Sequence, residues 1–118
     1  MGTSEVRFAR SWQVPAADGV VGISRDENGN AQLDIRVNHL APPERIAPGA
    51  TSYVVWVKPM LGDMNLQNLG ALRVDQNLSG DLQVITSLRH FQLMITPEAS
   101  VAAQRPSGPV VLEAEVSR

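Results

Sequence analysis

The sequence predicts an all-β fold, because strand patterns recur along the chain and helix patterns do not. Alternating apolar and polar residues return about every ten to fifteen residues. Eight prolines and nine glycines separate the short apolar runs, and no segment keeps helical spacing of its apolar side chains for more than about two turns. Tyr53-Val54-Val55-Trp56-Val57 is a run of bulky β-formers typical of a central strand. Residues 1–118 are therefore expected to form one β domain.

Eight strands are expected, each bounded by proline, glycine or other turn residues. In chain order they span 5–14, 20–25, 31–40, 53–57, 67–75, 82–86, 91–95 and 110–116. In the first strand, alternation places Val6, Phe8, Trp12 and Val14 on one face, with Arg10 breaking the pattern at an edge or a bulge. In the last strand, Glu113 and Glu115 are expected to point outward.

Two connections carry the clearest signals. Asn28-Gly29, within Asp26–Asn30, supplies residues that tolerate positive φ, so it predicts a hairpin turn before strand 31–40. In that strand Leu33, Ile35 and Val37 alternate with polar residues, which indicates one buried and one wet face. Residues 41–50 contain three prolines; such a segment cannot join a ladder, and we expect it to cross from one sheet to another.

These features together predict an antiparallel, immunoglobulin-like β-sandwich of about seven to eight strands, with a closed barrel as the alternative. Trp56 is expected to lie sealed between the two sheets. Because Val54 and Trp56 point away from Tyr53, Val55 and Val57, we expect either that both faces of the central strand are covered or that a loop caps one of them. Gly70 is expected to make room for Trp56 on the neighbouring strand.

Composition excludes several classes of function. The formal net charge is −2 and the basic residues are scattered, so no nucleic-acid partner is expected. The chain has no cysteine, which excludes a disulfide, a thiolate zinc site and a cysteine nucleophile. No apolar run reaches the roughly 18 residues of a membrane span, so this chain is not expected to insert into a membrane. Residues 1–4 are interpreted as a flexible or expression-derived tail, in which Met1-Gly2 could replace a removed leader.

No metal, cofactor or catalytic site is predicted. His39 and His90 lack further ligands at metal-site spacing, and Met60, Met64 and Met94 are interpreted as packing residues rather than Cu(I) ligands. A metal or small-ligand carrier that uses these five residues stays open as the alternative function.

The carboxylate pairs of the sequence do not predict acid–base chemistry. Asp26-Glu27 falls in the expected hairpin turn, and Glu113 and Glu115 alternate outward on a strand, so both pairs should be solvated. The pattern Asp26-x-Asn28-x-Asn30 resembles the start of a calcium loop, but its twelfth position is Val37, which is no ligand. No Gly-x-Ser-x-Gly elbow occurs in the sequence. The chain is therefore not expected to be an enzyme.

Four segments in order resemble the C-terminal domain of the anti-sigma-K factor family. They are Tyr53–Val57, Gly70-Ala71-Leu72, Phe91-Gln92-Leu93-Met94-Ile95-Thr96-Pro97-Glu98 and Pro106-Ser107-Gly108-Pro109-Val110-Val111-Leu112. The resemblance covers the chain from residue 53 onward and implies an extracytoplasmic β-sandwich that acts in sensing or regulated proteolysis without catalytic residues. This sequence departs from the family in lacking the sigma-binding domain and the membrane helix, so we expect a stand-alone relative or an excised outer domain.

The expected function is therefore that of a non-enzymatic bacterial module for protein interaction or sensing, located in the periplasm or at the cell surface. Its expected partner is a protein, and its leader or anchor is expected to be missing from this chain.

Overall fold

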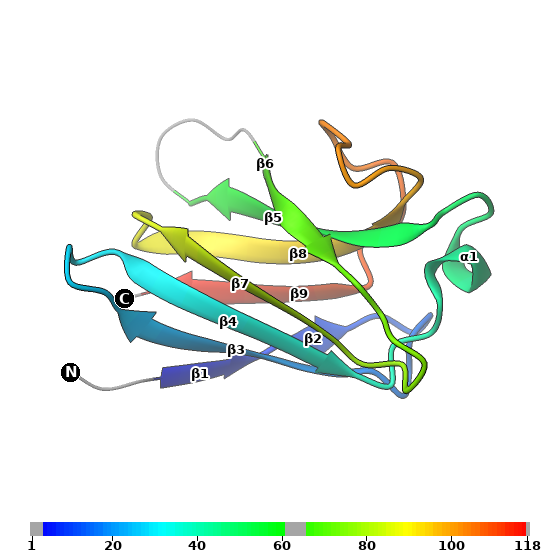
Figure 1. The fold of residues 1–118 in the computed structure, drawn as a ribbon, viewed down its shortest axis with the longest axis horizontal. Coiled ribbons are helices and arrows are strands. Elements are labelled where there is room, and N and C mark those ends of the chain that lie inside the picture. The colour runs from blue at the N-terminus through cyan, green and yellow to red at the C-terminus, as the bar shows by residue number, and fades with distance from the viewer. Residues whose placement is uncertain (1–3, 61–65, 118) are drawn as a thin grey trace.

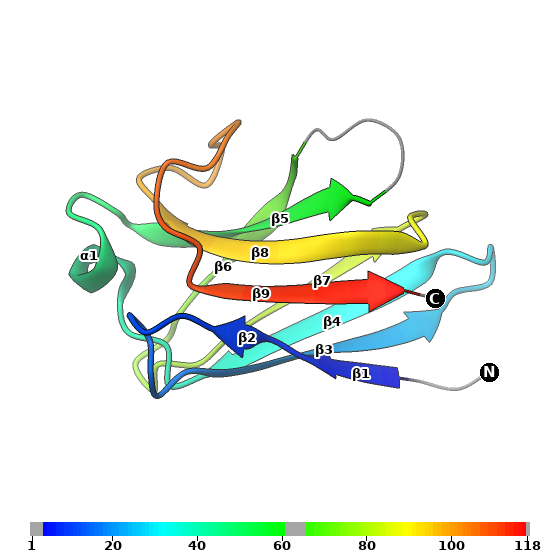
Figure 2. The same ribbon diagram turned by 180° about the vertical axis from the view of Figure 1, so that it is seen from behind.

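Two antiparallel sheets form a β-sandwich in the computed structural model, which describes residues 4–60 and 66–117 (Figures 1 and 2). Sheet A has the strand order β1-β3-β4-β7, and sheet B has the order β2-β9-β8-β5-β6. The strands are β1 (Ser4–Arg7), β2 (Ala9–Arg10), β3 (Asp18–Arg25), β4 (Ala31–Asn38), β5 (Ser52–Pro59), β6 (Gln67–Leu72), β7 (Gly80–Thr86), β8 (His90–Glu98) and β9 (Leu112–Ser117). The predicted all-β sandwich is confirmed, with nine strands in the described residues.

The first expected strand is divided between the two sheets. β1 pairs with β3 in sheet A, and β2 pairs with β9 in sheet B. The chain changes sheets at Phe8, whose side chain is buried and whose N–H donates to the Gly19 carbonyl at 2.9 Å. The expected irregularity at Arg10 therefore lies two residues earlier, at Phe8.

The alternation of the first expected strand fails at Trp12, which is 86% exposed although Phe8 and Val14, predicted on the same face, are buried. After Ser11 donates its N–H to Val111, the chain turns, with the N–H of Val14 donating to the Ser11 carbonyl at 3.2 Å. The turn breaks the strand alternation, and Val14 fills the core position instead. Pro15 then prevents the segment from returning to the ladder, since it has no N–H.

The hairpin between β3 and β4 is confirmed. Gly29 has φ 81°, and the Asp26 carboxylate accepts the backbone N–H groups of Asn28 and Asn30 at 2.9 and 2.8 Å. Along β4 the predicted alternation holds, since Leu33, Ile35 and Val37 are buried and Gln32, Arg36 and Asn38 are exposed.

The predicted crossing at residues 41–50 is also confirmed, because it joins β4 of sheet A to β5 of sheet B. It contains a four-residue helix, α1 (Pro43–Ile46), which the sequence analysis did not predict. Pro43 is compatible with the first helical position, where the missing N–H costs nothing. The Tyr53 hydroxyl donates to the Ala41 carbonyl at 2.5 Å and so attaches the crossing to the central strand.

Trp56 is completely buried, but it does not lie between the sheets as predicted. Tyr53, Val55 and Val57 of β5 belong to the core between the sheets, so Val54 and Trp56 lie on the outer face of sheet B. The segment from 99 to 109 covers the part of that face around Trp56. The Asn68 side chain, opposite Trp56 on β6, donates to the carbonyls of Val101 and Ala103 in this segment at 3.0 and 2.9 Å.

The role expected for Gly70 is wrong as well. A β-carbon at position 70 would lie 3.4 Å from the Leu82 side chain of sheet A, and Trp56 is not among its nearest atoms. Gly70 has φ 142°, and the β5–β6 register shifts between Val55 and Trp56. The glycine therefore serves a bulge that needs positive φ.

The single tyrosine gives a test of this packing. Burial, with a smaller effect of the nearby Glu44 carboxylate, raises the pKa of Tyr53 above its ordinary value of 10.0. An unfolded tyrosine therefore ionises before the folded one, so the Tyr53 contribution to stability is present below pH 10 and is lost as the pH rises above it.

We expect Tyr53→Phe to lower the free energy of unfolding at pH 7 by about 1 kcal/mol, through the lost hydrogen bond to Ala41. The difference between variant and wild type should shrink above pH 10, as measured by urea unfolding. A difference that stays constant from pH 7 to the alkaline range would contradict the buried, neutral hydroxyl.

Candidate functional site

Four long connections meet at one end of the sandwich, which we call the loop end: 11–17, 39–51, 73–79 and 99–111. The register places them together, because Asp18 pairs with Asn38, Val37 pairs with Gly80, and Ser52 pairs with Glu98. β1 begins and β9 finishes at the opposite end, as Figure 1 shows. The loop end is thus the face turned away from the start of β1 and the end of β9.

Exposed apolar side chains are concentrated at the loop end. Five large apolar residues are exposed among the described residues, and four of them lie in these loops: Trp12, Leu78, Val101 and Val110. The fifth, Ile85, lies on β7. Trp12 and Val110 are on neighbouring segments, since the Ser11 N–H donates to the Val111 carbonyl at 2.9 Å. Neighbouring exposed apolar groups such as Trp12 and Val110 mark interaction surfaces more often than isolated ones do.

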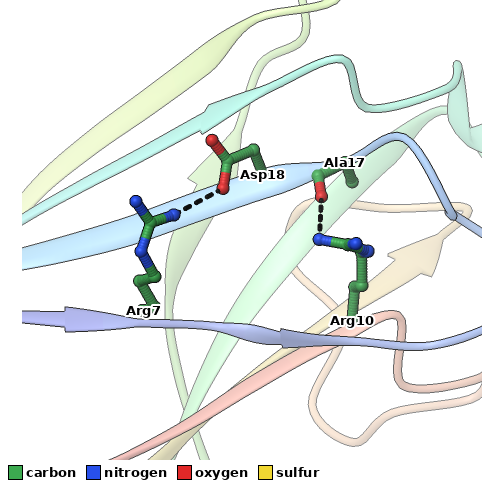
Figure 3. A network of polar contacts seen from close by, with 4 residues as sticks. All are labelled: Arg7, Arg10, Ala17 and Asp18. Atoms are coloured by element: carbon green, nitrogen blue, oxygen red, sulfur yellow. Dashed lines mark hydrogen bonds and ion pairs between the residues drawn. The ribbon is translucent and has the colours of Figure 1, made fainter.

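The loop that carries Trp12, residues 11–17, is anchored at several points. Val14 and Ala17 are buried in the core, and the Ala17 N–H donates to the Val14 carbonyl at 3.0 Å. Figure 3 shows Arg10 reaching the Ala17 carbonyl at 3.5 Å and Arg7 pairing with Asp18 at 3.0 Å. The exposed ion pair contributes little to stability, so the buried side chains hold the loop. Trp12 is therefore presented to solvent by a fixed backbone.

Two shallow grooves flank Arg73 at the same end. One, of about 360 Å³, lies between the end of β4 and the start of β7, and the other, of about 270 Å³, lies against Pro43 and the start of β5. Arg73 lines both and makes no ion pair with any residue in the described ranges. One Asp75 oxygen accepts the N–H groups of Asn77 and Ser79 at 2.8 and 3.0 Å, so Asp75 shapes its own turn.

A buried polar network fixes the 99–111 loop. The Trp56 indole N–H donates to the Thr96 hydroxyl at 2.8 Å, and this hydroxyl donates to the Glu98 carboxylate at 2.6 Å. The same carboxylate accepts the Ser107 hydroxyl at 2.6 Å, the Ser107 N–H at 3.0 Å and the Gly108 N–H at 3.3 Å. No described buried side-chain polar atom lacks a partner. The network joins β5, β8 and the loop.

The Glu98 carboxylate is stable in its ionised form although only 2% of the residue is exposed. Burial raises its pKa, but the hydrogen bonds from Ser107, Thr96 and Gly108 outweigh burial and hold the pKa below the ordinary value of 4.5. A hydrogen-bonded carboxylate of this kind holds a loop in place rather than moving protons. The network therefore holds the 99–111 loop against β8.

Three segments of the resemblance described above meet in this network: the central strand through Trp56, the eighth strand through Thr96 and Glu98, and the closing turn through Ser107 and Gly108. These residues fall in separate motifs of the sequence, and no local pattern predicts that they touch. The signal that could have found them is Glu98 itself, an acidic residue directly after an apolar strand and Pro97.

The residues considered as metal ligands do not converge. His39 follows the end of β4 at the loop end, whereas His90 begins β8 at the opposite end. The N–H of Met60 donates to the His90 carbonyl at 3.0 Å, Met94 lies within β8, and Met64 lies outside the described residues. Within 4–60 and 66–117, no three His, Cys, Asp or Glu side chains gather in a possible metal site.

The carboxylates considered for acid–base or calcium chemistry lie where the sequence predicts, and one of them makes a further contact. Asp26 caps its turn, Glu113 and Glu115 point outward on β9, and Val37 is buried. The addition is His90, whose Nε2 lies 3.0 Å from a Glu115 oxygen across neighbouring strands. The sequence analysis missed this pair, because 25 residues separate its members.

No protein-family model matches the sequence, and no curated protein matches it. Among the described residues, no helix has the length and hydrophobicity required to cross a membrane.

The buried network predicts a specific acid sensitivity. We expect Glu98→Gln to lower the free energy of unfolding at pH 7 by about 2 kcal/mol or more, because an amide –NH₂ would face donors that now meet a carboxylate. Since the folded pKa of Glu98 is depressed, its contribution is present above pH 4.5 and is lost as the pH falls below that value. Urea unfolding from pH 7 to pH 3 should show a smaller acid loss in the variant than in wild type. Equal acid losses in both proteins would rule out this role of Glu98.

Substitution of the two tryptophans should change the free energy of unfolding by very different amounts. Trp12→Ala should change the free energy of unfolding by less than about 0.5 kcal/mol, because the indole makes few contacts with the folded domain. Trp56→Phe should cost about 2 kcal/mol or more, because it removes a buried hydrogen bond and leaves a void. Thermal and urea unfolding of both variants measure this, and a large loss for Trp12→Ala would mean that its side chain is structural.

Proposed function

We propose that this chain is a non-enzymatic protein-interaction or sensing module of the immunoglobulin-like class, which works outside the cytoplasm and contacts a protein partner through its loop end. The observation that carries the proposal is Trp12, an indole 86% exposed on an anchored loop. Tryptophan is enriched among residues that dominate binding energies at protein interfaces. An indole exposed to water lowers the solubility of a folded domain. A role in binding a partner accounts for that exposure.

The way in which Trp12 is held supports the same proposal. Because Val14 and Ala17 are buried on the same loop, a partner would not have to order this backbone on binding. A pre-organised surface loses less conformational entropy in a complex and therefore binds more tightly for the same contacts. Val110, on the neighbouring segment, extends the apolar contact, while the grooves beside Arg73 offer polar contacts at the rim.

The periplasmic or cell-surface location rests on the resemblance to the anti-sigma-K outer domain. Its support is that Trp56, Thr96, Glu98, Ser107 and Gly108, which belong to separate segments of that resemblance, act together as one structural unit. The immunoglobulin-like class is supported by the first strand, which is shared between the two sheets. Fractionation of the source cells, followed by protease treatment of intact cells, tests the location: protection from external protease together with recovery in the cytoplasm would contradict it.

The partner surface can be tested by photo-crosslinking. With p-benzoylphenylalanine in place of Trp12, we expect ultraviolet light to give a discrete protein adduct in extracts of the source cells. The matched control places the same group at Glu27, which is exposed at the opposite end of the sandwich. Unlabelled wild-type protein should compete for the adduct at least about tenfold better than Trp12→Ala, which is a typical effect of losing an interface tryptophan.

An adduct at position 27 without one at position 12 would contradict the loop-end assignment. Equal competition by wild type and by Trp12→Ala would show that the indole does not bind the partner.

A further inference from the structure

Two turns of the sandwich share one hydrogen-bonding pattern and differ at one position. In each turn, an aspartate oxygen accepts the N–H groups of the second and fourth residues that follow it, and the aspartate N–H donates to the carbonyl of the fourth. These residues are Asp26, Asn28 and Asn30 between β3 and β4, and Asp75, Asn77 and Ser79 between β6 and β7. The third residue after the aspartate has positive φ in both turns, and it is Gly29 at 81° in one and Leu78 at 62° in the other.

The backbone conformation of Leu78 is unfavourable for a leucine. Positive φ brings the β-carbon of an ordinary residue close to its own backbone, so a bulky side chain there costs free energy that glycine avoids. A β-carbon at Gly29 would meet nothing within 4 Å, so that glycine is needed for its backbone conformation and not for space. The turn at residues 75–79 would therefore form with less strain if position 78 were glycine.

The Leu78 side chain contributes little to the fold in return. It is 37% exposed, and it belongs neither to the described core nor to the partly buried apolar residues packed against that core. The turn is held through its backbone, because the Leu40 N–H donates to the Leu78 carbonyl at 2.9 Å, a bond that a glycine would keep. Residues with strained backbones are concentrated at binding sites, where the strain serves function. The strain at Leu78 therefore indicates a contact outside this chain.

Leu78 lies near enough to Trp12 for one partner to touch both. The loop 11–17 leads into the start of β3, and the connection 73–79 leads into the start of β7. Both starting residues pair with the end of β4, so this one strand separates the two loops where they join sheet A. Two strand spacings correspond to about 10 Å. Figures 1 and 2 show both connections at the same end of the sandwich.

The same connection carries a positive charge that the described residues leave unpaired. Arg73 lines both grooves of the loop end and forms no ion pair within 4–60 and 66–117. Asp75 and Asp81 line the larger groove as well, but one Asp75 oxygen is engaged by the N–H groups of its own turn, and neither residue forms an ion pair with Arg73. A guanidinium that a partner covers needs an acceptor in place of water. A carboxylate matches its planar donors best.

We propose that the connection 73–79 is a second contact surface for the protein partner of the loop end, with Leu78 against an apolar group of that partner and Arg73 against a carboxylate. The proposal rests on the function proposed above and adds the chemistry of the partner. The partner presents a protein surface on which an exposed apolar side chain lies beside an acidic one. Leucine occupies position 78 because binding needs its side chain, although the turn itself favours glycine.

Substitutions at the two matched turn positions separate strain from binding. Leu78→Gly should leave the midpoint of thermal unfolding unchanged or raise it. Gly29→Leu should lower the midpoint by about 2 °C or more, because it adds strain without adding a contact. A fall of more than about 2 °C for Leu78→Gly would mean that the side chain serves the fold. An unchanged midpoint for Gly29→Leu would mean that leucine is not strained in this turn. Either result would overturn the proposal.

Photo-crosslinking from the turn tests the contact itself. With p-benzoylphenylalanine in place of the exposed Gln76, we expect an adduct in extracts of the source cells with the same protein that position 12 captures. The matched control is Glu27, which has the same place in the other turn and is also exposed. Unlabelled wild-type protein should compete for the adduct at least about tenfold better than Leu78→Gly, as is typical for an important interface side chain. The competition, and not the adduct alone, decides the outcome.

A charge series at position 73 tests the acidic group of the partner. Arg73→Gln should compete less well than wild type, and Arg73→Glu less well again, because a glutamate would face the partner's carboxylate with a like charge. Equal competition by Arg73→Gln and Arg73→Glu would contradict the assigned carboxylate.

Failure of this proposal can be told from failure of the function proposed for Trp12. If position 12 captures a partner and Leu78→Gly competes for that adduct as well as wild type does, the loop end binds without the turn and this proposal is wrong. If position 76 captures a protein for which Leu78→Gly competes poorly, and position 12 captures none, the contact at the turn stands and the role of Trp12 falls. If neither position captures a protein, both proposals are wrong.

Discussion

The covered part of the outer face of sheet B, around Trp56, depends on one buried carboxylate. Glu98 lies at the end of β8 and accepts hydrogen bonds from the Thr96 hydroxyl, from the Ser107 hydroxyl and N–H, and from the Gly108 N–H. Placing a charge out of contact with water is costly unless its hydrogen-bonding capacity is filled. The hydrogen-bonding capacity of Glu98 is filled by Thr96, on the same strand, and by the turn that contains Ser107 and Gly108. The buried charge therefore determines where that turn lies, and the turn covers Trp56.

The chemistry of the covering loop is suited to this arrangement. Pro106 and Pro109 flank Ser107 and Gly108, the two loop residues that donate to Glu98. Proline restricts the unfolded chain, so the loop loses less conformational entropy on folding. Gly108 packs so closely on β8 that a β-carbon would lie 2.3 Å from the Pro97 carbonyl oxygen. A side chain there would push the loop away from the strand. The loop is therefore held by polar contacts and close backbone packing, while its Val101 side chain stays exposed.

Local patterns predicted the parts of this fold that local chemistry determines. The Asn28-Gly29 hairpin, the alternation of Leu33, Ile35 and Val37, and the proline-rich crossing all follow from neighbouring residues, and the structure has each of them. Predictions for Trp12, Trp56 and Gly70 required knowledge of contacts between distant segments and were wrong in that respect. Alternation places Trp56 on one of two faces, but it cannot tell whether a sheet or a loop covers that face. The alternation that placed Trp12 ends at Ser11, where the chain turns.

The candidate site was even less accessible to sequence reasoning. A tryptophan is by default assigned to a core, so its exposure on an anchored loop emerges only when Val14 and Ala17 are seen to fill the core instead. The pairing of Glu98 with Ser107 spans nine residues and an irregular loop, for which no periodic pattern exists. The order of strands within the two sheets likewise depends on pairings between residues far apart in the chain.

Amide hydrogen exchange of the native protein tests the central claim most directly, namely that Glu98 fixes the 99–111 loop over Trp56. The N–H groups of Ser107 and Gly108, together with the Trp56 indole N–H, should exchange much more slowly than an unstructured peptide. The Arg105 N–H, which has no hydrogen bond to any residue within 4–60 and 66–117, should exchange faster than they do. Exchange of all three groups at the rate of an open chain would mean that the loop does not rest on the carboxylate, and the account of the outer face would be wrong.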